Sequence, residues 1–430
     1  MKINIVPAIV FLATTVLVQA EDSLSHEQFI PLNSLTESVA NQETEPTSSS
    51  ASVTSVADTL QQDAARTDSI ADTTQTNTVV ENPYGLPEEI LPLWNSMSIK
   101  QKAAQMVMVY LSPAQFLIDN EFGAVLVMKN HLKDTAAFKN KIREANEGMK
   151  IPLLVASDQE GGLVNRLGGI SEKWKHAPSA KEMRDMSTDS VKLIAEDIGS
   201  ELIELGINMN LAPVLDPAKD HRKKNSFMEE SARSWEKDST STEKVQAFVQ
   251  GMRQSGVVCV SKHFPGYDSW TNSDHQIAIS ASPKKKIAYN VEFFKRLSDD
   301  IPVTMMSSVR FIRISSRPAV FEPKIVKMAR DMNPETVILT DDLWGVSLRA
   351  WVSGTERVKS KGYPRKDFRK LIRTALTAGN DMFMITYPAK AVEMVNYLVQ
   401  ISKNNKTYRN RIEESAARII KMKYKAGLIK

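Results

Sequence analysis

The sequence contains few of the residues and patterns that bind metals or nucleotides. It has one cysteine in 430 residues, Cys259, so a disulfide within the chain is excluded. Cys259 lies in an apolar run and is expected to be a small core residue. No spacing of His, Cys, Asp or Glu is typical of a metal site, and no Gly-rich phosphate loop follows the first expected strand. We therefore expect no metal and no cofactor.

Long apolar runs are also scarce. One run, Ile3–Val18, follows a basic start at Lys2 and precedes the small residues typical of a cleavage site. This pattern predicts a signal peptide over residues 1–20, cut after Ala20, and export to the periplasm or the extracellular space. An uncleaved anchor is the alternative, although the run is shorter than the roughly 20 residues of a spanning helix. No other segment is apolar enough to cross a membrane, so we do not expect an integral membrane protein after cleavage.

Aromatic residues are rare in residues 21–82, which are rich in Ser, Thr, Gln, Asn, Asp and Glu. Such a segment cannot bury enough apolar surface to offset its chain entropy, which predicts a disordered low-complexity tether. It holds eleven Asp and Glu against the single Arg66, a net charge of −10. Because the whole chain carries +4 and Lys2 contributes +1, residues 83–430 carry +13.

The positive net charge of residues 83–430 indicates which binding partners to expect. A strong positive charge favours anionic surfaces such as a bacterial cell envelope, through long-range attraction. Plain solubility explains the charge equally well. Nucleic acid is a weaker interpretation, because no basic-aromatic cluster or helix-turn-helix pattern accompanies the charge. We expect a monomer that binds no nucleic acid.

Residues 83–430 alternate between short apolar runs and longer amphipathic stretches. A helix is predicted first, over Ile99–Tyr110. The runs that follow and are typical of buried strands are 123–128, 152–156, 207–214, 257–260, 302–306, 336–340 and 381–385. The stretches between them are long enough for a crossover helix each. Seven or eight such repeats predict a single (β/α)8 barrel of the TIM type, with an open doubly wound sheet as the alternative.

Charged side chains follow these strands, at the end where a barrel builds its site. Lys262 and His263 come directly after the run 257–260, and a polar loop beyond them carries Asp274 and His275. The other polar residues at or beyond strand ends are Asp158, Glu160, Arg166, Asp216, Arg233, Ser307, Ser308, Asp341 and Asp342. Acids, arginines and a lysine on one rim suit a polyhydroxylated substrate, because they hydrogen-bond sugar hydroxyls.

Six segments of this region resemble glycoside hydrolase family 3, and within it the single-domain β-N-acetylglucosaminidases. They are SDQEGGLVNRL (157–167), GINMNLAPVLDP (206–217), SARSW (231–235), SKHFPG (261–266), VILTDDL (337–343) and TALTAGNDM (374–382). The closing EESAARIIKMKYKAGL (413–428) is similar to the helix that ends the family's barrel. Six motifs in the family's order, each at a strand end, make the resemblance specific, and it implies a family 3 barrel over residues 83–430.

The resemblance implies a role for each matching residue. Asp341 matches the nucleophile, which would attack the anomeric carbon, form a covalent glycosyl-enzyme and retain configuration. His275 matches the acid/base of the N-acetylglucosaminidase branch, and a histidine suits that role because its unperturbed pKa is near neutrality. The residues that match those holding the first sugar are Asp158, Arg166, Arg233, Lys262 and His263.

Several positions depart from the family pattern, among them Tyr267-Asp268 after the FPG and Leu163, where an arginine is expected. The aspartate that orients the acid/base histidine is replaced by Ser273, and the nearest acid has moved to Asp274, next to His275. Adjacent side chains on an extended segment point opposite ways, so Asp274 replaces the missing partner only if the loop is irregular. Asp268 is another acid that could serve as partner. Trp344 stands where a small residue is usual.

These observations predict an exported retaining glycosidase that hydrolyses terminal β-linked N-acetylhexosamine, with peptidoglycan fragments as its source. Two alternatives within the enzymes are another β-glycosidase and a phosphorolytic variant, in which phosphate replaces water. A third alternative is a catalytically weakened carbohydrate-binding or envelope protein. The nucleophile and the sugar-holding positions are retained, which favours the enzyme because a pure scaffold has no need of them.

Overall fold

The computed structural model describes residues 82–356, 358–359 and 361–430. The predicted signal peptide, and the predicted tether apart from Asn82, lie outside these residues. Within the described part of the chain, no helix combines the length and apolar character needed to span a bilayer.

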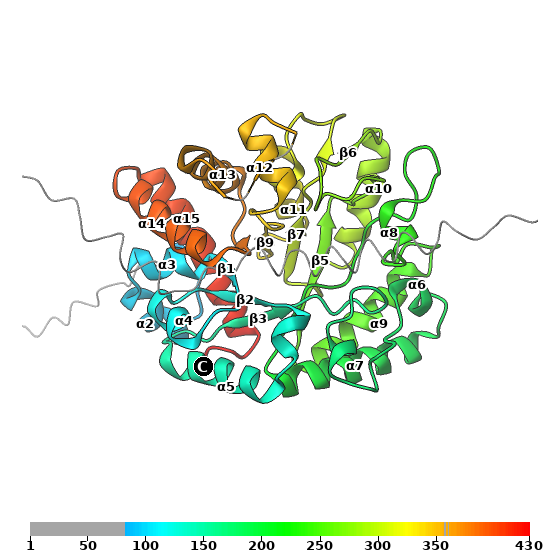
Figure 1. Cartoon of the computed structure of the whole chain (residues 1–430), viewed down its shortest axis with the longest axis horizontal. Coiled ribbons are helices and arrows are strands. Elements are labelled where there is room, and N and C mark those ends of the chain that lie inside the picture. Colours follow the sequence, from blue (N-terminus) through cyan, green and yellow to red (C-terminus); the bar gives the residue numbers. More distant parts are fainter. Residues whose placement is uncertain (1–81, 357, 360) are drawn as a thin grey trace, which may run out of the picture. The chain divides into compact units, whose positions relative to one another are not determined.

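Eight parallel strands form the centre of the described body (Figure 1). They are β1 (Val107–Tyr110), β2 (Ala124–Val127), β3 (Leu154–Ser157), β4 (Met209–Asn210), β5 (Val258–Phe264), β7 (Val303–Met306), β9 (Val337–Leu339) and β10 (Phe383–Ile385). Their order in the sheet is β10-β1-β2-β3-β4-β5-β7-β9. The two ends of this order meet: the backbone N–H groups of Asp381 and Met382 donate to the Ile338 carbonyl at 2.8 and 3.0 Å. The sheet is therefore closed into a barrel, which confirms the predicted fold and excludes the open sheet.

The first strand was not among the predicted runs. The helix predicted over residues 99–110 ends early: α3 covers Ile99–Gln105, with a capping box at Ser98, and β1 begins at Val107. The prediction was wrong because alternating methionine and valine fit either element by sequence alone. In the structure β1 lies between β10 and β2, where its backbone pairs on both sides.

Helices surround the strands and connect them (Figure 1). Beyond α3 they are α2 (Leu91–Ser96), α4 (Ala114–Asn120), α5 (Thr135–Gly148), α6 (Ala180–Met183), α7 (Thr188–Leu205), α8 (Phe227–Glu230), α9 (Ser241–Gln254), α10 (Lys284–Lys295), α11 (Pro323–Met332), α12 (Val346–Ser353), α13 (Arg365–Ala378), α14 (Pro388–Lys403) and α15 (Lys406–Lys425). The close packing of α7 on α9 depends on Gly251, where an added Cβ would lie 2.3 Å from the Lys192 carbonyl oxygen.

The core fills the barrel and the layer between strands and helices. Cys259 is 1 % exposed within it, as expected for a small core residue. One charged cluster is also buried, at the amino end of β10. The fully buried Asp381 accepts hydrogen bonds from Arg411 at 3.0 Å and Arg418 at 3.2 Å, both on α15, and pairs with Arg330 of α11. This cluster joins the last helix to the base of the barrel.

A second, two-stranded sheet lies outside the barrel. It pairs β6 (Ile279–Ser280) in parallel with β8 (Arg310–Phe311). Both strands follow residues at the carboxyl ends of the barrel strands: β6 begins four residues after His275, and β8 begins two residues after Ser308. The small sheet therefore flanks the mouth of the barrel, where the site residues gather.

Candidate active site

Five charged side chains form an ion-pair network at the carboxyl ends of β3 and β5. Lys262 Nζ, which is 2 % exposed, lies 2.7 Å from Asp158 Oδ1 and 2.6 Å from Glu160 Oε1. Arg233, in the connection after β4, binds Glu160 through two parallel hydrogen bonds, from Nε at 2.7 Å and from an Nη at 2.9 Å. Arg166, which is also buried, approaches Asp158 to 3.8 Å. These side chains come from the connections after β3 and β4 and from β5 itself, and together they form one floor, which we call the site floor.

The charges in this floor stabilise one another. Burial alone would raise the pKa of Asp158 and Glu160, but the neighbouring cations outweigh it and hold both pKa values below the usual range. Burial likewise opposes the charged form of Lys262 and of Arg233, and the carboxylates outweigh it and raise both pKa values. All four groups are therefore charged at neutral pH, with oxygen and nitrogen atoms fixed in place for a polar ligand.

His263 is held by a carboxylate that is fully buried. Asp216, after β4, accepts a hydrogen bond from the His263 backbone N–H at 2.9 Å, and its second oxygen lies 2.6 Å from His263 Nδ1. The same carboxylate accepts from the Tyr267 backbone N–H at 2.6 Å. Asp216 thus fixes the orientation of the imidazole and the start of the loop that follows.

Asp341 lies directly beyond β9, at the same end of the barrel. One of its oxygens accepts a hydrogen bond from Ser308 Oγ at 2.6 Å, and the other accepts from the Asp342 backbone N–H at 2.8 Å. The carboxylate is only partly buried, so the mouth remains open on one side of it. A carboxylate that is held by two donors and partly exposed has the arrangement of a positioned nucleophile.

The neighbouring Asp342 is turned into the protein. It accepts hydrogen bonds from Thr386 Oγ1 at 2.7 Å and from the Trp344 backbone N–H at 2.9 Å. Burial raises the pKa of Asp342 to about 6, although these hydrogen bonds act to lower it. Trp344 is 4 % exposed and stacks on Tyr387, with ring centroids 5.2 Å apart. The large residue at this position therefore fills the space behind the two aspartates and does not line the mouth.

Residues 267–275, which we call the mouth loop, carry the remaining predicted site residues. The Tyr267 hydroxyl accepts a hydrogen bond from the Ser273 backbone N–H at 2.8 Å and donates to the Thr271 carbonyl. Ser273 is buried, whereas Asp274 and His275 are exposed. The predicted departures at Ser273 and Asp274 thus lie on a loop that the Tyr267 side chain holds in shape.

Asp268 lies apart from the other acids of the mouth. Its carboxylate accepts a hydrogen bond from Ser282, and burial raises its pKa. Among the described residues, no hydrogen bond or ion pair joins Asp268 to His275. Asp274 is an exposed residue, but the protein around its carboxyl group and the charge of Asp341 raise its pKa.

Glu160, Asp216 and Ser308 complete the site, and each supports a residue that the motifs do single out. Glu160 binds Arg233 and Lys262, Asp216 binds His263, and Ser308 binds Asp341. All three follow a strand, and Glu160 and Asp216 also lie within two of the six motifs, 157–167 and 206–217. It does not reveal their partners, because each pair spans tens of residues along the chain.

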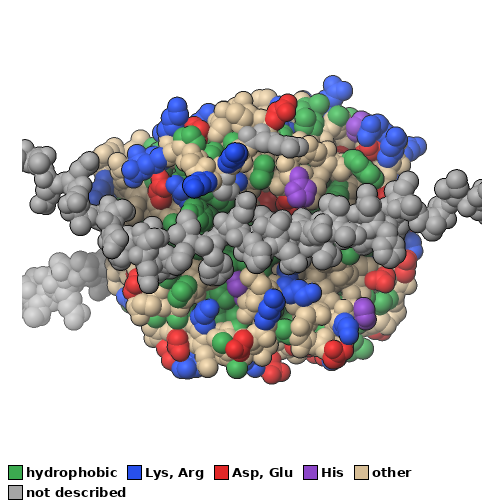
Figure 2. All heavy atoms as spheres, viewed as in Figure 1, with side chains coloured by type: hydrophobic (Ala, Val, Ile, Leu, Met, Phe, Trp, Pro, Cys, Tyr) green, Lys and Arg blue, Asp and Glu red, His purple; other side chains and the backbone are tan. Residues whose placement is uncertain are grey.

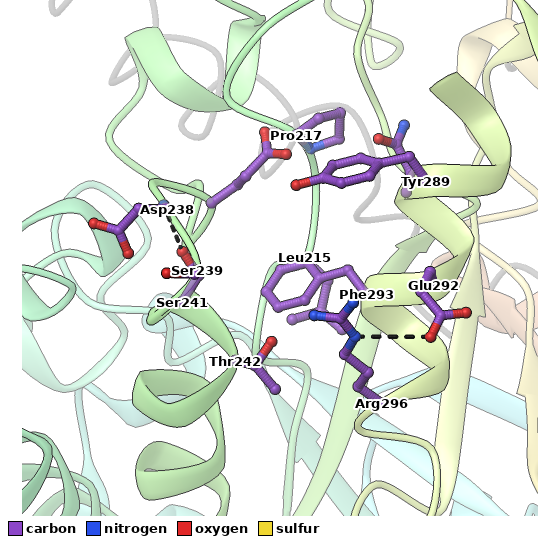
Figure 3. Close-up of a pocket in the computed structure, with 12 residues that line it drawn as sticks. Leu215, Pro217, Asp238, Ser239, Ser241, Thr242, Tyr289, Glu292, Phe293 and Arg296 are labelled. Carbon is purple, nitrogen blue, oxygen red and sulfur yellow. Dashed lines mark hydrogen bonds and ion pairs between the residues drawn. The ribbon is translucent and has the colours of Figure 1, made fainter. Parts of the chain in front are cut away.

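A small cavity of about 70 Å³ lies between the start of α9 and α10 (Figure 3). Leu215 and Pro217 line it, but the side chain of the intervening Asp216 turns the other way, to His263. Thr242 and Phe293 contribute to its walls (Figure 3). None of the charged residues of the floor lines this cavity, so it is separate from the mouth of the barrel.

A closed parallel barrel with fixed charged groups at its carboxyl ends is the architecture of barrel enzymes. The chain belongs to glycosyl hydrolase family 3: the model of that family's N-terminal domain matches residues 98–422. This match confirms the resemblance that the six motifs indicate.

Curated relatives carry the name beta-hexosaminidase. The chain is 30 % identical over 211 residues to Beta-hexosaminidase LpqI of Mycobacterium tuberculosis, a match covering 47 % of this chain and 50 % of the relative. It is 25 % identical over 294 residues to Beta-hexosaminidase of Haemophilus influenzae strain PittEE, covering 66 % and 77 % respectively. The chain thus spans about half the length of the mycobacterial relative that it matches.

Solved structures share the fold. The Beta-N-acetylhexosaminidase from Beutenbergia cavernae superimposes with a TM-score of 0.64 at 26 % identity, covering 76 % of this chain and 99 % of that one. LpqI of M. tuberculosis superimposes with a TM-score of 0.63 at 23 % identity, covering 75 % and 93 %. Because the identity to LpqI is only 23 %, this second superposition supports the barrel fold and nothing beyond it.

Proposed function

We propose that this chain is a retaining glycosidase that hydrolyses terminal β-linked N-acetylhexosamine. The observation that carries the proposal is the pairing of a positioned Asp341 with a charged floor of fixed donors and acceptors across the mouth. The names of the relatives, beta-hexosaminidase and beta-N-acetylhexosaminidase, support the same reaction.

Asp341 is the proposed nucleophile. Ser308 and the Asp342 backbone N–H hold its two oxygens, so little motion is needed before attack on the anomeric carbon. The bond from that carbon to Asp341 forms as the bond to the leaving oxygen breaks, and water later cleaves the covalent intermediate with net retention.

The floor is the proposed binding site of the terminal sugar. Asp158, Arg166 and Lys262 supply fixed charges that hydrogen-bond hydroxyl groups, and His263 and Arg233 extend the polar surface toward the mouth loop. Because these groups are paired with one another, they keep their geometry when water leaves on substrate binding. The proton exchange that the leaving group needs is assigned to the mouth loop, which carries Asp274 and His275.

The proposed substrate is an anionic glycan of the cell envelope, such as a peptidoglycan fragment, and the proposed location is outside the cytoplasm. Residues 276–291 and 307–321, which contain β6 and β8, hold six Lys and Arg and no Asp or Glu. Figure 2 shows Lys and Arg side chains gathered at the upper right edge of the molecule, where Figure 1 has β6 and the loop before α8. A cationic rim next to the mouth attracts a negatively charged leaving group.

The test is hydrolysis of a chromogenic β-N-acetylglucosaminide by the wild type and by Asp341→Ala. We expect turnover by the wild type, β-configured sugar as the first product by NMR, and no turnover by the variant. Slow substrates are expected to trap a sugar adduct on Asp341 that mass spectrometry of the digested protein locates. A rate that rises with inorganic phosphate and yields sugar phosphate would identify the phosphorolytic alternative.

A second candidate is a weakened carbohydrate-binding protein of the envelope. The exposed His275 favours it, because no hydrogen bond within the described residues orients the imidazole ring. Binding of N-acetylglucosamine without turnover of any β-glycoside would support this candidate and overturn the enzyme.

A further inference from the structure

We propose that this protein docks on the surface of an anionic phospholipid bilayer through one face beside the mouth of the barrel. This face, which we call the membrane face, consists of the hairpin 218–225, Trp270, residues 276–291 and residues 307–321. Docking concerns what the protein lies against, so it is independent of the reaction proposed for Asp341.

The first observation is the charge of the membrane face. Its three segments hold ten Lys and Arg and one acid, Asp220, which gives a net charge of +9 out of the +13 in residues 83–430. Asp220 is only 7 % exposed. A dense surface of one sign attracts anionic lipid headgroups. The fully exposed cations are Lys219, Arg222, Lys223, Lys224, Lys284, Lys285, Arg313 and Arg317.

The hairpin holds its cations in a fixed arrangement. Lys219 and Asn225 form an antiparallel bridge at its base. At its tip, one oxygen of the Asp220 carboxylate accepts hydrogen bonds from the backbone N–H groups of Arg222 at 2.7 Å and Lys224 at 3.0 Å. The one acid of the membrane face therefore serves to shape the turn, and the lysines and the arginine beyond it point into solvent.

The second observation is a set of exposed apolar side chains among these cations. Of the eight large hydrophobic side chains exposed in the described residues, four belong to the membrane face: Trp270 (62 %), Ile279 (46 %), Tyr289 (62 %) and Ile312 (47 %). Aliphatic side chains gain nothing from a soluble polyanion. The interface of a bilayer accepts them together with Trp and Tyr, while its headgroups pair with Lys and Arg. The combination favours a bilayer.

The small sheet presents its apolar residues on one side. Its register pairs Ile279 with Arg310 and Ser280 with Phe311. Successive side chains of a strand point to opposite faces, so the buried Ser280 and Phe311 mark the inner face. Ile279 and Ile312 therefore lie on the outer face, with the half-buried Arg310 between them in the alternation.

Contacts between the segments make the membrane face continuous. Glu236 accepts a hydrogen bond from the Ala218 backbone N–H at 2.8 Å and lies 3.9 Å from Lys286 Nζ, which joins the base of the hairpin to α10. The Phe227 backbone N–H, just beyond the hairpin, donates at 3.2 Å to the carbonyl of the residue before Trp270. In Figure 1, β6, α10 and α8 accordingly lie at the same edge of the barrel.

The test is co-sedimentation of the full chain with vesicles of phosphatidylcholine alone or mixed with phosphatidylglycerol. We expect tighter binding to the anionic vesicles, and weaker binding as salt is added. The variant Lys224→Glu, Lys284→Glu, Arg313→Glu takes one cation from each segment. Its binding is expected to weaken by roughly 100-fold, because each cation near an anionic surface strengthens binding by about fivefold.

A matched control reverses three exposed lysines elsewhere: Lys100→Glu, Lys403→Glu, Lys406→Glu. The net charge changes equally, but these residues lie on α3, α14 and α15, at the opposite edge of Figure 1. We expect this control to bind within about threefold of the wild type, because screening limits the reach of distant charges. Residues 1–81 are the same in every protein compared, so a difference between variants reports the membrane face.

The apolar residues have readouts of their own. The other five tryptophans are buried or half-buried, so a blue shift of fluorescence on anionic vesicles is expected to come from Trp270 and to be absent in Trp270→Phe. The double variant Ile279→Ser, Ile312→Ser is expected to weaken binding by roughly tenfold or more. Leu193→Ser, which changes an exposed residue of α7, serves as its control.

Three results would overturn docking on a bilayer: no preference for anionic vesicles, equal binding by the two charge-reversed variants, or binding to soluble polyphosphate that matches vesicle binding and is insensitive to the isoleucine changes. The last result would identify a soluble polyanion as the partner. Circular dichroism spectra equal to that of the wild type show that the variants fold. The proposed function survives each result, because turnover is measured without vesicles, and Asp341→Ala is expected to bind vesicles like the wild type.

Discussion

Ser308 Oγ donates a hydrogen bond of 2.6 Å to Asp341, across two strands that are adjacent in the barrel. Ser308 is 4 % exposed, so this donor does not exchange freely with water. This hydrogen bond fixes one oxygen of the Asp341 carboxylate and thereby orients the plane of the carboxylate.

We predict that Ser308→Ala lowers kcat by roughly tenfold, because a hydrogen bond to a charged group is worth about 1.5–3 kcal/mol and part of it serves orientation. Steady-state kinetics on a chromogenic substrate measure the effect, with Ser298→Ala, before the opposite end of β7, as a control. An unchanged kcat with a raised KM would contradict a role in positioning the nucleophile.

Lys262 neutralises two acids that are both close to it. Replacement by methionine keeps much of the volume but leaves Asp158 and Glu160 without their shared cation, so we predict a loss of about 3–5 kcal/mol in the free energy of unfolding. Urea denaturation followed by tryptophan fluorescence measures it. The double variant Lys262→Met, Glu160→Gln should recover part of the loss. If the two changes were simply additive, the ion-pair network would not be coupled.

Asp381 predicts how the stability of the barrel depends on pH. Burial opposes its charge, but the arginines around it lower its pKa to about 2 in the folded protein, below the value near 3.9 of an unfolded chain. Its contribution to the free energy of unfolding is therefore complete above about pH 4 and is lost as the pH falls through about 2.

We expect acid denaturation curves to show this loss, amounting to about 2–3 kcal/mol for a shift of this size, and Asp381→Asn to remove that part of the pH dependence. The same variant should be less stable at pH 7, because three arginines lose their common carboxylate. Identical pH dependence in wild type and variant would show that Asp381 does not link protonation to folding.

Burial raises the pKa of the Cys259 thiol to about 12. Because the thiolate is the reactive form and the residue is 1 % exposed, we predict that the folded protein reacts with a thiol reagent many times more slowly than the denatured protein. A colorimetric thiol assay with and without denaturant measures the two rates. Rapid labelling of one thiol in native buffer would contradict the described packing of β5.

The sequence predicted the barrel because seven of its eight strands are apolar runs separated by helix-length stretches. It misplaced β1, because the run at 106–110 continues the apolar pattern of the helix before it. What fixes that strand is pairing with β10, more than 270 residues away, and such pairing leaves no local signal.

The candidate site likewise has features that the sequence predicts and features that it does not. Asp341 was predicted from its place after a strand, and Lys262 and His263 were expected directly after the run 257–260. The structure extends β5 through both residues, and it puts all three at one end of the barrel. Glu160, Asp216 and Ser308 bind other site residues across different connections of the barrel. These contacts cannot be read from the spacing of residues along the chain.

The way in which the mouth loop is attached to the barrel bears on how the acid/base residues can differ among members of this family. Tyr267 secures the loop at its start, and the bond from the Arg310 backbone N–H to the Ala278 carbonyl, at 2.9 Å, secures the chain just after it. The side chains proposed to exchange protons lie between these two anchors, apart from the floor proposed to hold the sugar. We therefore expect the segment between residues 267 and 278 to accept the corresponding loops of other family members. Such grafts would exchange one acid/base chemistry for another while the barrel stays the same.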